Sequence, residues 1–166
     1  VEMNNSISLI GMAGAGKSSI GKKLAEHLNL DFIDSDLLIE KRYGQSLQDI
    51  LNQNGNEKFK EIEEGALLSV EFNQIVLATG GSAVFCDTAV EYIKENSKVI
   101  YLEVTYEDIS ARIPNFSERG LIKRPDQTIQ EAYKEREELY QNFADHIVQN
   151  NGKIESCLNK ILTLIN

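Results

Sequence analysis

The stretch "GMAGAGKSS", residues 11–19, decides the fold. The apolar run "SISLI" (6–10) precedes it and is typical of a short buried strand. The segment "KSSIGKKLAEHL" (17–28) overlaps its end and repeats apolar residues at the spacing of a helix. Residues 11–18 fit the pattern G-x-x-x-x-G-K-[ST], so the sequence predicts a phosphate-binding loop between a strand and a helix.

Each part of this pattern has a physical reason. Glycine has no Cβ atom and tolerates a positive φ, so successive backbone N–H groups can converge on phosphate oxygens. The helix that follows adds the positive end of its dipole. Lys17 supplies a charge for the β- and γ-phosphates, and the Ser18 hydroxyl is a ligand for Mg²⁺.

The alternative is a glycine-rich turn without a ligand, but the position between strand and helix favours a nucleotide site for ATP or GTP with Mg²⁺. The residues expected to bind the nucleotide are Gly11, Gly14, Ala15, Gly16, Lys17, Ser18 and Ser19.

The composition limits the class of protein. The chain has 166 residues, of which 42% are hydrophobic and 26% charged, which is ordinary for one globular domain. Its formal net charge of −9 argues against nucleic acid or an anionic membrane as the main partner, so an anionic ligand needs a local basic pocket. Cys86 and Cys157 form no metal or redox spacing, and we see no signal-peptide pattern, so we expect a cytoplasmic protein.

The rest of the chain alternates strands with helices, which predicts an α/β fold with a parallel sheet of about five strands covered by helices on both faces. Further strands are expected at 31–36, 74–81, 98–104 and 145–148. Helices are expected near 36–42, 46–53, 56–71, 86–95, 105–112, 127–144 and 153–165. Residues 113–125 are polar, carry a proline near each end and are interpreted as a mobile loop. Without a linker or a repeat, residues 1–166 are expected to form one domain.

Asp34 and Asp36 stand two residues apart at the end of the second expected strand. Side chains at i and i+2 of a strand point the same way, so both carboxylates are expected above the strand ends, where open α/β sheets bind ligands. One would hold Mg²⁺ through water, and the other would accept a proton from an attacking hydroxyl. The alternative is a helix N-cap, because "DSDLLIEK" (34–41) also resembles a helix start; the two roles can coexist, one for each acid.

An arginine falls on the apolar face of the helix expected near 127–144. Arg136 lies on the stripe formed by Ile129, Tyr133, Tyr140 and Phe143. Burying a guanidinium alone is costly, so Arg136 needs a partner. A bound carboxylate is one interpretation, and a structural ion pair with Asp or Glu is the other.

Further motifs accompany the phosphate-binding loop. They are FIDSD (32–36), FKEIE (59–63), ATGGSAV (78–84), the arginines of 112–124 and EREELY (135–140). Together with GMAGAGKS, they make nearly the whole chain resemble the shikimate kinase family, small P-loop kinases with a three-layer fold. The resemblance implies phosphoryl transfer from MgATP to a hydroxyl of shikimate, giving shikimate 3-phosphate in aromatic amino acid biosynthesis.

The resemblance also implies roles for individual residues. Asp36 would hold the reacting hydroxyl and act as the base, and Asp34 would lie nearer the Mg²⁺. Arg136 and the cation at position 60 would hold the substrate carboxylate, within an acceptor-binding part that includes the helices of about 36–71.

The loop 113–125 would be the lid of such a kinase, and it offers two candidate arginines. Arg124 precedes a proline, as in the family, but it lies too close to Arg136 for the family's usual interval. Arg119 has the better spacing and is expected to be the transition-state arginine, with Arg112 as a nucleotide contact. The alternative for each is a solvated loop charge, which we favour for Arg124.

Two positions depart from the family. Lys60 stands where shikimate kinases carry arginine; lysine cannot make the bidentate fork to a carboxylate, although it can neutralise one. The alternative is that Lys60 pairs with Glu64 one turn later. Gly80 and Gly81 would allow close backbone approach to the substrate, but Ser82 replaces the usual third glycine, which places a hydroxyl near the substrate or repositions the turn.

Because both departures fall on the acceptor side, other functions stay open. One is a kinase for another small hydroxylated acid or polyol. A different class is a nucleotide-switched binding protein, although no guanine-reading N-K-x-D stretch is present. The expected partner is a small-molecule hydroxy acid, and the chain is expected to be a monomer.

Overall fold

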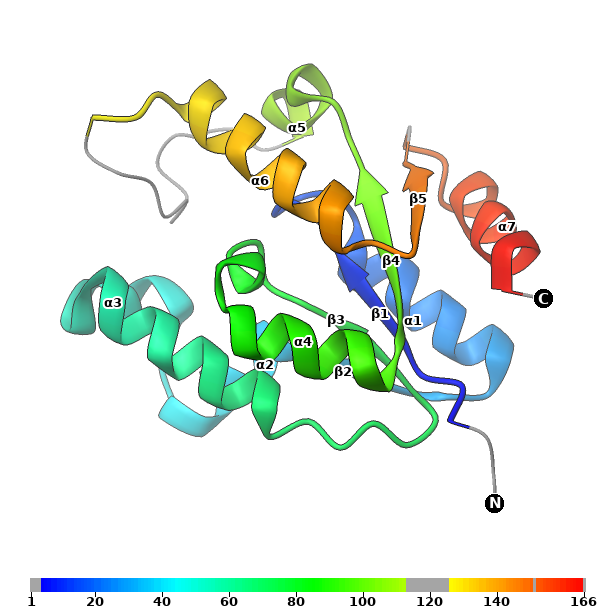
Figure 1. The fold of residues 1–166 in the computed structure, drawn as a ribbon, viewed down its shortest axis with the longest axis horizontal. Coiled ribbons are helices and arrows are strands. Elements are labelled where there is room, and N and C mark those ends of the chain that lie inside the picture. Colours follow the sequence, from blue (N-terminus) through cyan, green and yellow to red (C-terminus); the bar gives the residue numbers. More distant parts are fainter. Residues whose placement is uncertain (1–3, 113–125, 151, 166) are drawn as a thin grey trace.

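A five-stranded parallel sheet with strand order β2-β3-β1-β4-β5 forms the centre of the molecule (Figure 1). The computed structural model describes residues 4–112, 126–150 and 152–165. The strands are β1 (Ile7–Ile10), β2 (Asp31–Asp34), β3 (Ile75–Ala78), β4 (Lys98–Glu103) and β5 (His146–Gln149). The expected α/β fold with about five parallel strands is therefore confirmed.

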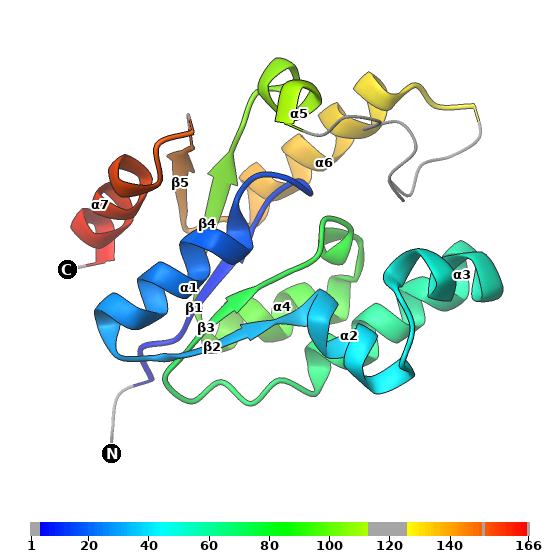
Figure 2. The same cartoon turned by 180° about the vertical axis from the view of Figure 1, so that it is seen from behind.

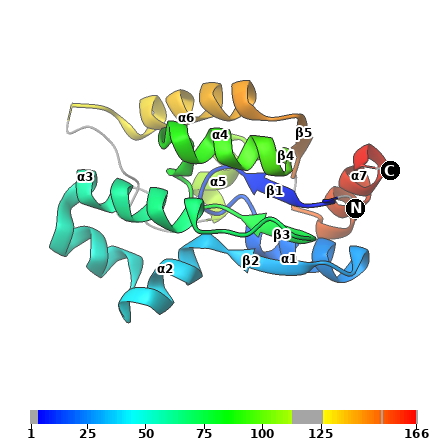
Figure 3. The same ribbon diagram turned by 60° about the horizontal axis from the view of Figure 1, so that its bottom comes forward.

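Helices cover both faces of the sheet. They are α1 (Lys17–Leu28), α2 (Ser35–Tyr43), α3 (Leu47–Leu68), α4 (Asp87–Asn96), α5 (Tyr106–Arg112), α6 (Ile129–Phe143) and α7 (Ile154–Ile165), with a short 3₁₀ helix η1 (Ala83–Phe85). Helices α1 and α7 pack on one face, and α4 and α6 on the other (Figure 3). Helices α2 and α3 pack against each other beside the carboxyl end of β2 (Figure 2).

The central strands are buried on both sides, as their mainly apolar sequences predict. All four residues of β1 and of β3 are buried. They join the helices in one apolar core, and a smaller cluster lies between α2 and α3 around Ile39, Ile50 and Phe59. No helix in the described part of the chain is both long and apolar enough to cross a membrane.

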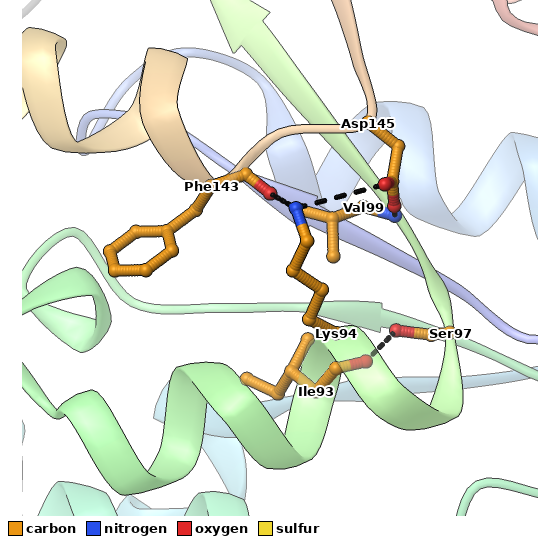
Figure 4. Close-up of polar contacts among 6 residues, drawn as sticks. All are labelled: Ile93, Lys94, Ser97, Val99, Phe143 and Asp145. Carbon is orange, nitrogen blue, oxygen red and sulfur yellow. Dashed lines mark hydrogen bonds and ion pairs between the residues drawn. The ribbon is translucent and has the colours of Figure 1, made fainter.

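Polar contacts join the segments at the amino ends of β4 and β5, at the opposite end of the strands from the phosphate-binding loop (Figure 4). Lys94 Nζ at the end of α4 donates to the carbonyl of Phe143 at 2.8 Å and lies 3.8 Å from Asp145 Oδ1. Asp145 Oδ2 accepts from the backbone N–H of Val99 at 2.8 Å. These contacts hold the start of β4 beside the turn between α6 and β5.

The structure differs from the expected elements at two places. The second strand ends at Asp34 rather than at residue 36, because Asp34 caps α2 and the chain turns into this helix. The helices expected at 46–53 and 56–71 are two parts of α3, which departs from helical geometry at Gly55, where φ is 81° and ψ is 170°.

Candidate active site

The phosphate-binding loop has the predicted place and form. It joins β1 to α1, and the N-cap of α1 is Gly16, with φ 96° and ψ 16° in the left-handed region that favours glycine. A side chain at Gly16 would also meet the amide of Asn150, since an ideal Cβ would lie 2.7 Å from its Nδ2. That same Nδ2 donates to the carbonyl of Ala15 at 2.7 Å. Asn150, which directly follows the last residue of β5, therefore holds the loop by a hydrogen bond.

Lys17 is the first residue of α1, and its side chain contacts the backbone of this loop. The side chain is buried, with 8% exposed, and its Nζ donates to the carbonyl oxygens of Gly11 and, at 3.0 Å, of Met12. Burial lowers the pKa of Lys17 to about 8, while the nearby carboxylates of Asp36 and Asp34 act in the opposite direction. The ammonium is thus held where the loop is predicted to receive phosphates.

Ser18 and Asp34 are joined directly. Ser18 Oγ donates to Asp34 Oδ2 at 2.5 Å. The other oxygen, Oδ1, accepts from the backbone N–H groups of Asp36 at 3.0 Å and Leu37 at 3.2 Å, which makes Asp34 the N-cap of α2. The capping alternative considered from the sequence therefore holds for Asp34, and its second oxygen still faces Ser18.

This oxygen pair fits Mg²⁺. The described residues contain no group of three or more His, Cys, Asp or Glu side chains arranged to hold a metal. Mg²⁺ in kinases is bound by one or two protein oxygens, with phosphates and water completing its six positions. One hydroxyl and one carboxylate beside the phosphate-binding loop match that requirement.

Asp36 occupies a different element from the one expected. It lies in the first turn of α2, so the argument from side-chain alternation along a strand was wrong. Its carboxylate nevertheless packs on the glycine turn after β3: a Cβ at Gly80 would lie 2.5 Å from Asp36 Oδ1. Burial raises the pKa of Asp36 to about 6, opposed by the charge of Lys17.

Glu63 is a site residue that sequence reasoning missed, since it appeared there only within the FKEIE motif. Its side chain is 1% exposed, and a Cβ at Gly80 would lie 2.8 Å from Glu63 Oε2. Ser82 Oγ donates to Glu63 Oε1 at 3.0 Å. Burial, followed by the charge of Asp36, raises the pKa of Glu63 to about 7, and the Ser82 hydrogen bond acts to lower it. The available signal was position: Glu63 follows Phe59 by four residues on the buried face of α3.

The glycine turn after β3, formed by Gly80 and Gly81, contacts both the start of α2 and the phosphate-binding loop. Gly80 donates its backbone N–H to Ser35 Oγ at 3.2 Å, at the start of α2. Gly81 lies against the phosphate-binding loop, because a Cβ there would be 3.3 Å from the backbone nitrogen of Ala13. The Gly81 carbonyl accepts from the Tyr140 hydroxyl of α6. Close packing on both sides explains the lack of side chains at Gly80 and Gly81.

Arg136 lies on the buried face of α6, as predicted, with 1% exposed. Its Nη1 donates to the carbonyl of Ala132 at 3.3 Å. Burial lowers the pKa of Arg136, and Tyr140 and the carboxylates of Glu135 and Glu63 oppose that shift.

The ring of Phe85, the last residue of η1, connects this arginine to the second expected cation. The guanidinium carbon of Arg136 lies 4.8 Å from the ring centroid, and Lys60 Nζ lies 5.3 Å from it. Among the described ion pairs none joins Lys60 to Glu64, so the alternative partner for Lys60 is not found.

Arg112 lies beside the phosphate-binding loop. Its Nη1 donates to the carbonyl of Gly14 at 3.4 Å, and its Nη2 donates to the carbonyl of Asn150 at 2.7 Å. The expected lid at 113–125, with Arg119 and Arg124, lies outside the described residues.

The geometry combines two chemistries. One side offers backbone N–H groups, a lysine and two oxygen ligands, which suit a metal-bound nucleotide. The other offers a buried carboxylate with a raised pKa and two cations, which suit an acceptor that carries both a hydroxyl and an anionic group. The arrangement is therefore that of a small-molecule kinase.

Comparisons with known proteins agree with this assignment as a kinase, and they cover most of this chain. The family model described as "Shikimate kinase" matches residues 13–166. A shikimate kinase of Francisella tularensis subsp. novicida (strain U112) is 39% identical over 164 residues, which cover 96% of this chain and 93% of the relative. The structure of shikimate kinase from Acinetobacter baumannii in complex with shikimate is similar, with a TM-score of 0.88, 32% identity and coverage of 99% of this chain and 94% of that one. The structure from Aquifex aeolicus gives a TM-score of 0.82 at 31% identity, covering 95% of this chain and 94% of that one.

Proposed function

Because the chain belongs to the shikimate kinase family, its reaction is the ATP-dependent transfer of a phosphoryl group to a hydroxyl of shikimate, and we propose how its residues divide that task. It is a phosphotransferase with an alcohol acceptor. Membership of the family does not favour a kinase for another hydroxy acid or polyol, nor a nucleotide-switched binding protein.

The phosphate-binding loop holds the donor in this proposal. Lys17 and the backbone N–H groups of the loop bind the β- and γ-phosphates, aided by the N-terminus of α1. Ser18 and Asp34 hold Mg²⁺, whose charge neutralises the transferred group when it is bound. Their direct hydrogen bond at 2.5 Å supports this pairing. Arg112 contacts the nucleotide, and Arg119 is our proposal for the cation that stabilises the transition state.

The carboxylate of Asp36 is the observation that carries the acceptor side. It packs on Gly80, as Glu63 does, and its pKa of about 6 is close to neutral pH. A carboxylate with such a pKa can hold the attacking hydroxyl and accept its proton as the O–P bond forms. Gly80 and Gly81 let the acceptor approach the backbone, and Ser82 adds a hydroxyl to this turn.

Arg136 and Lys60 bind the carboxylate of shikimate in this proposal. Arg136 can make two parallel hydrogen bonds to a carboxylate, whereas Lys60 contributes a single positive charge. Their common position against the Phe85 ring supports a joint role.

The test is a coupled assay of ADP release with shikimate, quinate, gluconate and serine. We expect turnover with shikimate, and in Arg136→Ala a KM for shikimate about 30-fold or more above wild type, with the KM for ATP unchanged. Arg42→Ala, which removes an exposed arginine of α2, is the matched control and keeps the wild-type KM. Phosphorylation of an acceptor without a carboxylate, in preference to shikimate, would overturn the carboxylate assignment.

We also propose a single-domain monomer in the cytoplasm. One chain supplies every residue assigned to the site, which supports a monomer. Cys86 and Cys157 are both free and buried, which fits a reducing compartment. Light scattering at micromolar concentration tests the proposed monomer, because a dimer would give twice the mass of 18.6 kDa.

A further inference from the structure

Phe85 connects the two cations assigned to the acceptor. Lys60 comes from α3 and Arg136 from α6, and η1, which ends at Phe85, packs against both helices. The Arg136 guanidinium and the Lys60 ammonium lie 4.8 Å and 5.3 Å from the ring centroid. Both distances are within the range of about 6 Å at which a cation is attracted by the face of an aromatic ring.

The attraction solves a physical problem of this site. Two positive groups placed to grip one carboxylate repel each other, and Arg136 is buried, where its charged form is disfavoured. A long lysine side chain also has many rotamers and lacks the rigid fork of arginine. An aromatic face offsets the repulsion and restricts the lysine without introducing an anion that would compete with the acceptor carboxylate.

We propose that Phe85 is a positioning residue that orients Lys60 and Arg136 for the carboxylate of the acceptor. This inference rests on the proposed carboxylate-binding role of the two cations. The ring itself does not touch the reacting atoms in this account. Its effect is therefore confined to acceptor affinity, and the donor side is unaffected.

The experiment changes the electrostatics of the ring while keeping its shape. Phenylalanine at position 85 is replaced by 4-fluoro-, 3,5-difluoro- and 3,4,5-trifluorophenylalanine, which weaken the negative ring face stepwise. The KM for shikimate is expected to rise with each fluorine, to about 3- to 30-fold above wild type, while kcat and the KM for ATP stay constant. Phe85→Tyr should keep the wild-type KM, and Phe85→Leu should raise it.

Phe72→Leu is the matched control, because Phe72 is also a partly buried ring and contacts Tyr92 at 5.5 Å instead of a cation. It should lower the melting temperature without changing the KM for shikimate. If fluorination leaves this KM unchanged while Arg136→Ala raises it, the role of Phe85 is overturned and the carboxylate assignment stands. If Arg136→Ala also leaves it unchanged, the carboxylate assignment itself is wrong.

Discussion

Asp36 and Glu63 bring two carboxylates to the same glycine. Each would lie within 3 Å of a Cβ at Gly80, at 2.5 Å and 2.8 Å. Burial is the main cause of both raised pKa values, about 6 for Asp36 and about 7 for Glu63. The two residues still differ in their partners: Asp36 is influenced most by Lys17, and Glu63 accepts a hydrogen bond from Ser82. The charge of Lys17 beside Asp36 supports our proposal that Asp36, rather than Glu63, is the base.

Changing Asp36 to Asn should remove the base while preserving the shape of the side chain. We expect kcat to fall roughly 100- to 10,000-fold, with the Kd for ATP unchanged. Steady-state kinetics with titration calorimetry separates the two quantities. Asp31→Asn, at the exposed start of β2, is the control and should keep wild-type turnover. A variant of Asp36 that turns over at the wild-type rate would exclude it as the base.

Changing Ser82 to Ala should raise the pKa of Glu63 above about 7. The Ser82 hydroxyl donates to the carboxylate, and this hydrogen bond favours the ionised form. The pKa is measured by ¹³C NMR of the Glu63 carboxyl group over pH 5–9. Ser82→Thr keeps the hydroxyl and should titrate like wild type. An equal upward shift in both variants would mean that packing, rather than the hydrogen bond, sets this pKa.

At the scale of the elements, sequence patterns predicted the features that depend on residues close together in the chain. The phosphate-binding loop and the buried face of α6 follow from spacing alone, so the positions of Lys17 and Arg136 could be derived from the sequence. The end of β2 could not, because an Asp at a strand end and an Asp at a helix N-cap have the same local sequence. Here the hydrogen bonds from Asp36 and Leu37 to Asp34 decide for the cap.

The supporting residues of the site were hidden for a different reason. Glu63 meets Ser82 from another element, and Phe85 meets Arg136 across η1 and α6. Pairs this far apart in the sequence leave no periodic signal, although an acid on the apolar face of α3 is itself a warning of a buried partner. Asn150 is a further case, since its contact with Ala15 joins residues that lie 135 positions apart.

Changing Asn150 to Ala should loosen the phosphate-binding loop. The loss of its hydrogen bond to the Ala15 carbonyl is expected to raise the KM for ATP about 3- to 10-fold, with the KM for shikimate unchanged. Gln149→Ala, one residue earlier and exposed on β5, is the control. An equal rise of both KM values would indicate a general loss of structure instead.

At the scale of the whole molecule, the net charge of the chain has the same sign as the charge of its ligands. The chain carries a formal net charge of −9, yet both substrates of the reaction are anions. Lys17, Lys60, Arg112 and Arg136 gather at the carboxyl edge of the sheet and create a local exception. The buried carboxylates beside them impose a cost on folding that depends on pH.

Changing Glu63 to Gln should alter the pH dependence of stability. Its pKa is raised in the folded state from 4.5 to about 7, so the folded protein binds this proton more tightly than the unfolded chain. The stability that it contributes is present below pH 4.5 and is lost as the pH rises to about 7. Relative to wild type, the Gln variant should therefore gain up to about 3 kcal/mol between pH 5 and pH 8.

Urea unfolding at the two pH values measures this change. Glu61→Gln, exposed on the same helix, should follow the wild-type curve. Parallel curves for wild type and the Glu63 variant would show that the glutamate has its ordinary pKa.

The central position of β1 has a consequence for synthesis on the ribosome. Ile7 lies between Val76 of β3 and Lys98 of β4, so β1 is translated before both of the strands that pair with it in the sheet. Until Val76 has left the exit tunnel, β1 has neither neighbour, and until Lys98 has left it the strand still lacks the second. Contacts between such distant segments also slow the search for the native topology. The phosphate-binding loop, although translated 135 residues earlier, therefore gains its hydrogen bond from Asn150 only after the end of β5 has emerged.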